Sequence, residues 1–139
     1  MRHILCCAYA WGVHVRRILL ASVALVGLAC GSALAQDPKP KHGGLMSRGD
    51  QDLSAELVAE ADLLVLYVEA DDQPVVTAGA AGTLRRLARA RVPQQDIELT
   101  PAGDNRLSAS GLKLVRGDQV RAYVRFANGR EQTFAFTYW

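Results

Sequence analysis

Two side chains near residue 40 could do chemistry together: the imidazole of His42 and the thioether of Met46, four residues further on. A nitrogen donor and a soft sulfur donor suit Cu(I), which accepts low coordination numbers. The amine of Gln36 would add a third donor if the chain began there. The sequence therefore predicts a copper-type site at His42 and Met46, with a divalent metal as the alternative. The competing interpretation is that His42 is a solvated side chain and that Met46 packs into the core.

Asp71 and Asp72 form a second candidate site, because two neighbouring carboxylates could bind a hard cation. They follow a strong run of strand-forming residues and precede Gln73-Pro74. Aspartate is also favoured in ordinary turns, where it tolerates unusual backbone conformations. Both interpretations, a weak metal site and a simple turn, are open at this point.

The chain after residue 35 holds no cysteine and only one histidine, His42. This excludes a cysteine nucleophile and a metal cage of several His or Cys side chains. A Ser-His-Asp triad would need His42 as its base, but a leader rich in Gly and Pro supports a base poorly, and no nucleophile-elbow sequence is present. Gly79-Ala80-Ala81-Gly82 lacks the Lys-Ser or Lys-Thr that would follow in a phosphate-binding loop. We therefore expect no enzymatic activity.

The first 35 residues predict a secretory signal peptide. Arg16 and Arg17 supply positive charge, residues 18–29 form an apolar run, and Ala33-Leu34-Ala35 is a small-x-small cleavage site. A membrane-spanning helix needs roughly 20 apolar residues, so this run predicts export instead of an anchor. Cleavage after Ala35 would release the protein into the periplasm. The alternative is a lipoprotein with an acylated Cys30.

Removal of residues 1–35 would change the charge balance. Three of the 16 Lys and Arg residues lie in this segment and none of the 14 Asp and Glu residues does, so the net charge falls from +2 to −1. All three cysteines leave with the same segment. The remaining 104 residues can bury a core without disulfides. The basic balance of the full chain therefore favours no nucleic-acid partner.

Short alternating segments between turn signals predict an all-β domain over residues 45–139, after a flexible leader over residues 36–44. The central element is the run over residues 63–69, whose two faces are both mostly apolar, as in an inner strand. Asn128-Gly129 predicts a hairpin within residues 119–139. The spacing of the turns indicates a small antiparallel β-sandwich, Ig-like or transthyretin-like, of about seven or eight strands.

Two elements are ambiguous. Residues 53–60 alternate like a strand, although their Ala and Glu residues also favour a helix. The short link to the next strand favours the strand. Residues 83–92 prefer a helix slightly, but a strand is predicted there as well, because the surrounding pattern is β. Pro93 would end either element.

Several segments of the chain are similar to a family of small exported proteins of Gram-negative bacteria. The matching pieces are Lys41-His42-Gly43-Gly44, Glu56-Leu57-Val58, Leu66-Tyr67-Val68-Glu69, the run over residues 73–80 and the run over residues 99–107. A similar module is associated with heavy-metal efflux systems and their periplasmic adaptor subunits. The resemblance implies a periplasmic, non-enzymatic β-sandwich linked to metal handling. Asp71-Asp72 departs from the family, which often has Asp-His there, so a second imidazole is missing.

These observations predict a periplasmic binding module that acts in envelope heavy-metal homeostasis through His42 and Met46. The alternative is an interaction module that docks an envelope protein or a metal-efflux component through a sheet edge and binds no metal. Such an edge could be formed by the aromatic side chains of the last strand, or these could close the core. They are Phe134, Phe136, Tyr138 and Trp139. We expect membrane contact only through the signal peptide or an acylated Cys30.

Overall fold

The computed structural model describes residues 37–139. The predicted signal peptide over residues 1–35, the cleavage site after Ala35 and the candidate lipidation site Cys30 lie outside these residues. Between residues 37 and 139, no helix is long and apolar enough to cross a membrane.

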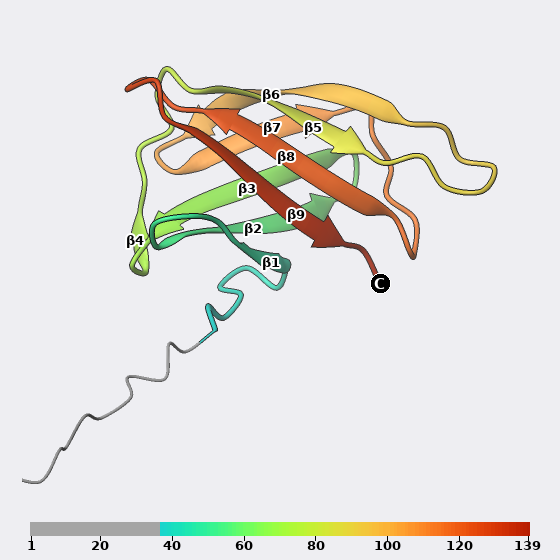
Figure 1. Ribbon diagram of the computed structural model, residues 1–139, viewed down its shortest axis with the longest axis horizontal. Coiled ribbons are helices and arrows are strands. Elements are labelled where there is room, and N and C mark those ends of the chain that lie inside the picture. The colour runs from blue at the N-terminus through green and yellow to red at the C-terminus, as the bar shows by residue number, and fades with distance from the viewer. Residues whose placement is uncertain (1–36) are drawn as a thin grey trace, which may run out of the picture. The chain divides into compact units, whose positions relative to one another are not determined.

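Strands alone form the regular structure of residues 37–139, which contain no helix (Figure 1). The nine strands are β1 (Leu45–Arg48), β2 (Leu53–Glu60), β3 (Leu63–Ala70), β4 (Gln73–Pro74), β5 (Ala81–Arg86), β6 (Gln95–Gly103), β7 (Arg106–Ser110), β8 (Gln119–Arg125) and β9 (Glu131–Thr137). All pairings are antiparallel, in the order β1-β2-β3-β7-β6-β5-β8-β9, and β4 pairs with the end of β3. The all-β prediction is confirmed, with nine strands instead of seven or eight.

The sheet nearly closes on itself in the manner of a barrel. Strand β6 joins its two halves, because its first part pairs with β5 and its last part pairs with β7. Strands β8 and β9 cross over β2 and β3 in Figure 1, so the two halves face each other. The edge strands β1 and β9 meet where the Ala135 N–H donates a hydrogen bond of 2.9 Å to Ser47 Oγ. This contact covers part of the edges that an open sheet would expose.

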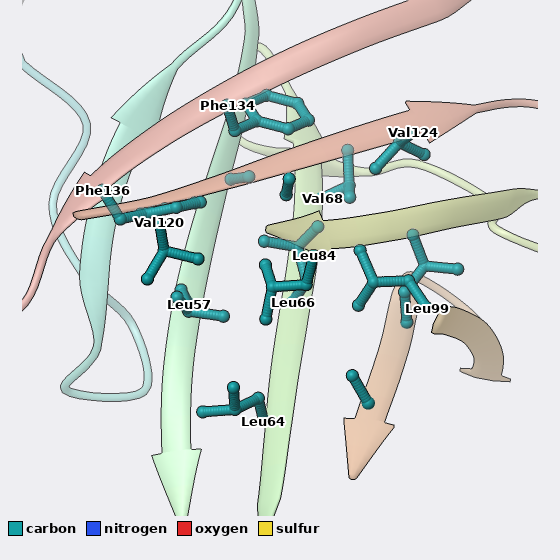
Figure 2. Packing of buried hydrophobic residues seen from close by; sticks show 14 of the residues in the cluster. Leu57, Leu64, Leu66, Val68, Leu84, Leu99, Val120, Val124, Phe134 and Phe136 are labelled. Atoms are coloured by element: carbon teal, nitrogen blue, oxygen red, sulfur yellow. The ribbon is translucent and has the colours of Figure 1, made fainter. Parts of the chain in front are cut away.

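The core lies between the two halves and is built from alternate residues of each strand. Leu64, Leu66 and Val68 of β3 are buried, as the alternation predicts. They pack in one cluster with side chains from both halves, including Leu84 of β5 and Phe134 of β9 (Figure 2). Full burial of an apolar side chain of this size contributes roughly 1.5–3 kcal/mol to folding. The last strand ends at Thr137, short of the predicted Trp139. Its aromatic residues Phe134 and Phe136 close the core, whereas Trp139, beyond the strand, is 77% exposed.

The two ambiguous elements have different outcomes. Residues 53–60 form strand β2, so the strand prediction is confirmed and the helix alternative is wrong. The prediction of a strand over residues 83–92 is right only up to Arg86, where β5 ends. The chain then forms a tight loop in which Arg89 and Val92 exchange backbone hydrogen bonds. Arg89 of this loop forms an ion pair with the fully buried carboxylate of Asp118, with 2.9 Å between Nε and Oδ1. Local propensity does not predict this long-range contact.

Two turn segments that carry the family resemblance lie against each other. The hydroxyl of the fully buried Thr77 lies 2.9 Å from the carbonyl oxygens of Gly103 and Arg106. The Thr77 N–H donates to the carbonyl oxygen of Asp104, also at 2.9 Å. These bonds attach the connection between β4 and β5 to the β6–β7 hairpin. Both segments therefore have a structural role in joining distant parts of the sheet.

Candidate functional site

The centre of the candidate site is the carboxylate of Glu56, which stands on the outer face of β2. Its neighbours in the sheet are Met46 of β1 and Tyr67 of β3, the residues that pair with it directly on either side. An outward-facing glutamate is normally solvated. Only 5% of this side chain is exposed, however, because the segment before β1 folds over it.

Backbone N–H groups of Lys41, His42 and Gly44 point at this carboxylate. Lys41 donates to Oε2 at 2.9 Å, His42 donates to Oε1 at 2.9 Å, and Gly44 donates to Oε1 at 2.7 Å. Glycines permit this path: Gly43 has a φ of +76°, and a Cβ on Gly44 would lie 2.5 Å from the carbonyl oxygen of Leu57. The Lys-His-Gly-Gly run is therefore a nest of donors closed around one carboxylate.

The imidazole of His42 is fixed on two sides. Its Nδ1 lies 2.9 Å from Glu56 Oε2, and its ring stacks on that of Tyr67 with 3.7 Å between centroids and 7° between planes. An ionised carboxylate only accepts hydrogen bonds, so Nδ1 carries the proton. Nε2 is then the nitrogen left for another partner, on a side chain that is 39% exposed.

Glu56 is held in its ionised form by these donors. Burial acts to raise the pKa of its carboxyl group, but the hydrogen bonds from the Gly44 N–H, the His42 ring and the Lys41 and His42 N–H groups outweigh burial. The pKa of Glu56 therefore lies below its ordinary value. A stable negative charge beneath the imidazole is the electrostatic basis of the site.

The side chain of Lys41 ties the same segment to β3. Its Nζ lies 2.8 Å from Glu69 Oε2 and donates to the carbonyl oxygen of Asp72 at 3.1 Å. The hydrogen bond to Glu69 is the main reason why the pKa of Lys41 is raised. The leader, which we expected to be flexible over residues 36–44, is thus bonded to the sheet from Lys41 to Gly44.

Met46 and His42, the two predicted metal ligands, both adjoin Glu56. Met46 pairs with it across β1 and β2, and the His42 ring bonds to it from the leader. The Met46 side chain is half-buried and lines a groove of about 510 Å³ between the leader and the end of the chain, together with Tyr138 and Trp139. The structure therefore places one nitrogen donor and one sulfur donor on the same face of β1 and β2.

Asp71 and Asp72 occupy a different place, the two-residue turn between β3 and β4. Both have positive φ, 49° and 62°, as hairpin turns of this length require. The Asp71 N–H donates to the carbonyl oxygen of Asp52 at 3.3 Å. Across residues 37–139, no three His, Cys, Asp or Glu side chains are grouped so that they could hold a metal ion. Asp71 and Asp72 therefore form a regular hairpin turn.

Glu56, Tyr67 and Lys41 are parts of the site that the sequence did not predict. The alternation of β2 marks Glu56 only as an outward, solvated residue, and its donors lie 12 to 15 positions away. The one usable signal is the resemblance, whose separate pieces include all three residues. Comparison of the chain with protein-family models, curated proteins and solved structures found no significant match. What the site can do is therefore argued from its geometry.

Proposed function

We propose that this protein is a periplasmic, non-enzymatic module that binds a soft metal ion, Cu(I), and serves in envelope metal homeostasis. His42 Nε2 is the first ligand in this proposal, and Met46 Sδ is the second. Export after removal of residues 1–35 belongs to the same proposal. The assignment of the fold as an Ig-like or transthyretin-like sandwich is also part of this proposal.

The observation that carries the proposal is the bond from His42 Nδ1 to the buried carboxylate of Glu56, at 2.9 Å. Histidines that bind metals commonly donate their other ring N–H to a carboxylate, which fixes the tautomer and makes the ligating nitrogen more basic. Stacking on Tyr67 fixes the plane of the ring as well. The free nitrogen is therefore oriented before any ligand arrives.

The donors present fit Cu(I) better than Zn(II). An imidazole and a thioether are the soft, low-coordination set that Cu(I) accepts. A structural zinc site takes four nitrogen, sulfur or carboxylate ligands in a tetrahedron. No such group of His, Cys, Asp or Glu side chains occurs within residues 37–139. Of the His and Glu side chains at this site, only His42 would ligate directly, because Glu56 is already engaged by the leader.

The test is a competition titration with Cu(I) under anaerobic conditions, against a chromophoric Cu(I) chelator. The protein is purified from the periplasmic fraction, its N-terminus is determined by mass spectrometry, and any cysteine that remains is alkylated. His42→Phe keeps a ring over Tyr67 but removes both nitrogens, and it should abolish binding. Met46→Leu, of similar volume, should weaken binding.

Two further variants test in the same titration whether Glu56 orients His42. Glu56→Gln should weaken Cu(I) binding by roughly 10- to 100-fold, as loss of an orienting partner does. Asp72→Asn is the matched control, and its affinity should equal that of the wild type. Equal affinities of the wild type and His42→Phe would overturn the proposal, as would complete absence of Cu(I) binding by the folded wild type.

Docking of an envelope protein through a sheet edge has less support. A docking strand needs unpaired backbone groups along an edge. The Ala135 N–H of β9 is already bonded to Ser47 of β1. The aromatic residues Phe134 and Phe136 are buried in the core and are not available at this edge.

A further inference from the structure

One end of the barrel gathers three segments that are distant in sequence: the loop over residues 87–94, the loop over residues 111–118 and the last residues of the chain. Arg89 links the two loops, through its ion pair with Asp118 at 2.9 Å and a hydrogen bond to the Arg116 carbonyl oxygen at 3.0 Å. The Tyr138 N–H donates to the Asp118 carbonyl oxygen at 2.8 Å, which brings the chain end to the second loop. We call this surface the basic end.

Exposed apolar side chains concentrate at the basic end. Four large hydrophobic residues within 37–139 are exposed, and three of them lie here. Val115 is 46% exposed, Trp139 is 77% exposed, and Leu63, which pairs with Ser110 just before the second loop, is 37% exposed. Tryptophan, which has an apolar ring system and a polar N–H, is enriched at the interface between water and lipid.

The same end of the barrel also carries cationic side chains. Arg89, Arg91, Lys113 and Arg116 are all exposed on the two loops. The acidic residues at this end are Asp118, which is buried against Arg89, Asp96, which is paired with Arg85, and Glu60 and Asp62 at the β2–β3 turn. The β1–β2, β3–β4 and β6–β7 turns lie at the opposite end of the barrel (Figure 1), and their sequences contain aspartates. They are Asp50, Asp52, Asp71, Asp72 and Asp104.

We infer that the basic end docks on an anionic lipid bilayer, with Trp139 and Val115 in the headgroup region and the loop cations over lipid phosphates. Apolar side chains ringed by Lys and Arg are the composition of surfaces that lie on anionic membranes. At the far end these five aspartates outnumber the nearby cations, so the charge polarity of the molecule turns the basic end towards a negative surface. The cations there are Arg48, Arg106, Arg125 and Arg130. No bilayer-spanning element is needed for such docking.

The test is a vesicle sedimentation assay with protein purified from the periplasmic fraction, after its N-terminus has been determined by mass spectrometry. Vesicles of phosphatidylglycerol and phosphatidylcholine are compared with vesicles of phosphatidylcholine alone. Each basic residue near an anionic surface contributes roughly a fivefold gain in binding. Lys113→Glu with Arg116→Glu should therefore weaken binding by about 25-fold or more, since two cations are lost and two anions added. Both replacements leave these hydrogen bonds possible, because Arg86 and Arg89 donate to the backbone carbonyl oxygens of Lys113 and Arg116 and not to their side chains.

Two controls separate docking from unspecific attraction. Arg106→Glu with Arg125→Glu changes the charge by the same amount at the opposite end of the barrel and should have a much smaller effect. Trp139→Ala should weaken binding at low and at high salt, because burial of the indole does not depend on ionic strength. A blue shift of Trp139 fluorescence on anionic vesicles should accompany binding.

The inference is overturned if the wild type ignores anionic vesicles, or if both charge-reversal pairs lose binding equally. Binding that survives the Lys113 and Arg116 reversals would also overturn it. Binding of a protein from the same membrane fraction, without binding to pure lipid vesicles, would assign the basic end to a protein partner instead.

Discussion

Replacement of Glu56 by glutamine tests whether one carboxylate holds the leader to the sheet. Glutamine has nearly the same shape, but it carries no charge, and its amide nitrogen would face N–H groups from which it cannot accept. In the wild type, four donors converge on this carboxylate: three backbone N–H groups and the His42 ring. Their loss should release residues 41–44 from β2.

The expected cost follows from two opposing contributions. A hydrogen bond to a charged group contributes about 1.5–3 kcal/mol, so four contribute roughly 6–12 kcal/mol. Fixing the backbone of the four residues 41–44 opposes this by about 1–2 kcal/mol for each residue, or roughly 4–8 kcal/mol. The free energy of unfolding should therefore fall by about 2–4 kcal/mol in Glu56→Gln.

Urea unfolding at pH 7, followed by circular dichroism, measures this loss as a lower transition midpoint. Glu60→Gln is the matched control, because Glu60 lies in the same strand and is exposed. Its effect should stay within about 0.5 kcal/mol, as for other surface changes. A Glu56→Gln variant that unfolds within the same 0.5 kcal/mol of the wild type would refute the reasoning, since the leader would then contribute nothing to stability.

Three further predictions concern the metal-free protein. The pKa of Glu56 is lowered by folding, so its stabilising contribution is complete above its ordinary value of 4.5 and is lost as the pH falls through the lower folded value; the urea midpoints of wild type and Glu56→Gln should converge as the pH falls below 4.5. Gly44→Ala should cost about 1–3 kcal/mol by the same unfolding assay, because its Cβ would meet the Leu57 carbonyl oxygen, and an unchanged midpoint would show that this approach relaxes freely. Thr77→Val, which keeps the side-chain shape, should lower the unfolding free energy by about 1–2 kcal/mol, because the carbonyl oxygens of Gly103 and Arg106 lose their hydroxyl partner; a midpoint equal to that of the wild type would exclude this.

Local patterns predicted the elements that depend on neighbouring residues. Asn128-Gly129 marked the last hairpin, and the alternation of Leu64, Leu66 and Val68 marked the buried face of β3. Residues 83–92 were harder, because after Arg86 the chain enters a loop whose Arg89 pairs with Asp118, 29 positions away. Such a pair exists only once the sheet has formed.

In the candidate site, too, some residues could be predicted from local sequence and others could not. His42 and Met46 could be predicted as ligands from their side chains alone. Their anchor could not, because Glu56 occupies an alternating outward position that is normally solvated. The content of Gly and Pro in residues 36–44 also predicted a flexible leader. In the structure, the same glycines permit the close backbone approach that fixes it.

The contact between Ser47 and Ala135 gives the amide hydrogen of Ala135 a particular value as a reporter. Gly44, the last donor to Glu56, directly precedes β1, and Ser47 lies within that strand. Release of the leader should therefore loosen the strand that closes the barrel. Exchange of the Ala135 amide with deuterium should speed up when Glu56 is replaced, and should slow if His42 binds a metal as proposed. The contact between β1 and β9 would thus report the state of a site on the outer surface of the barrel.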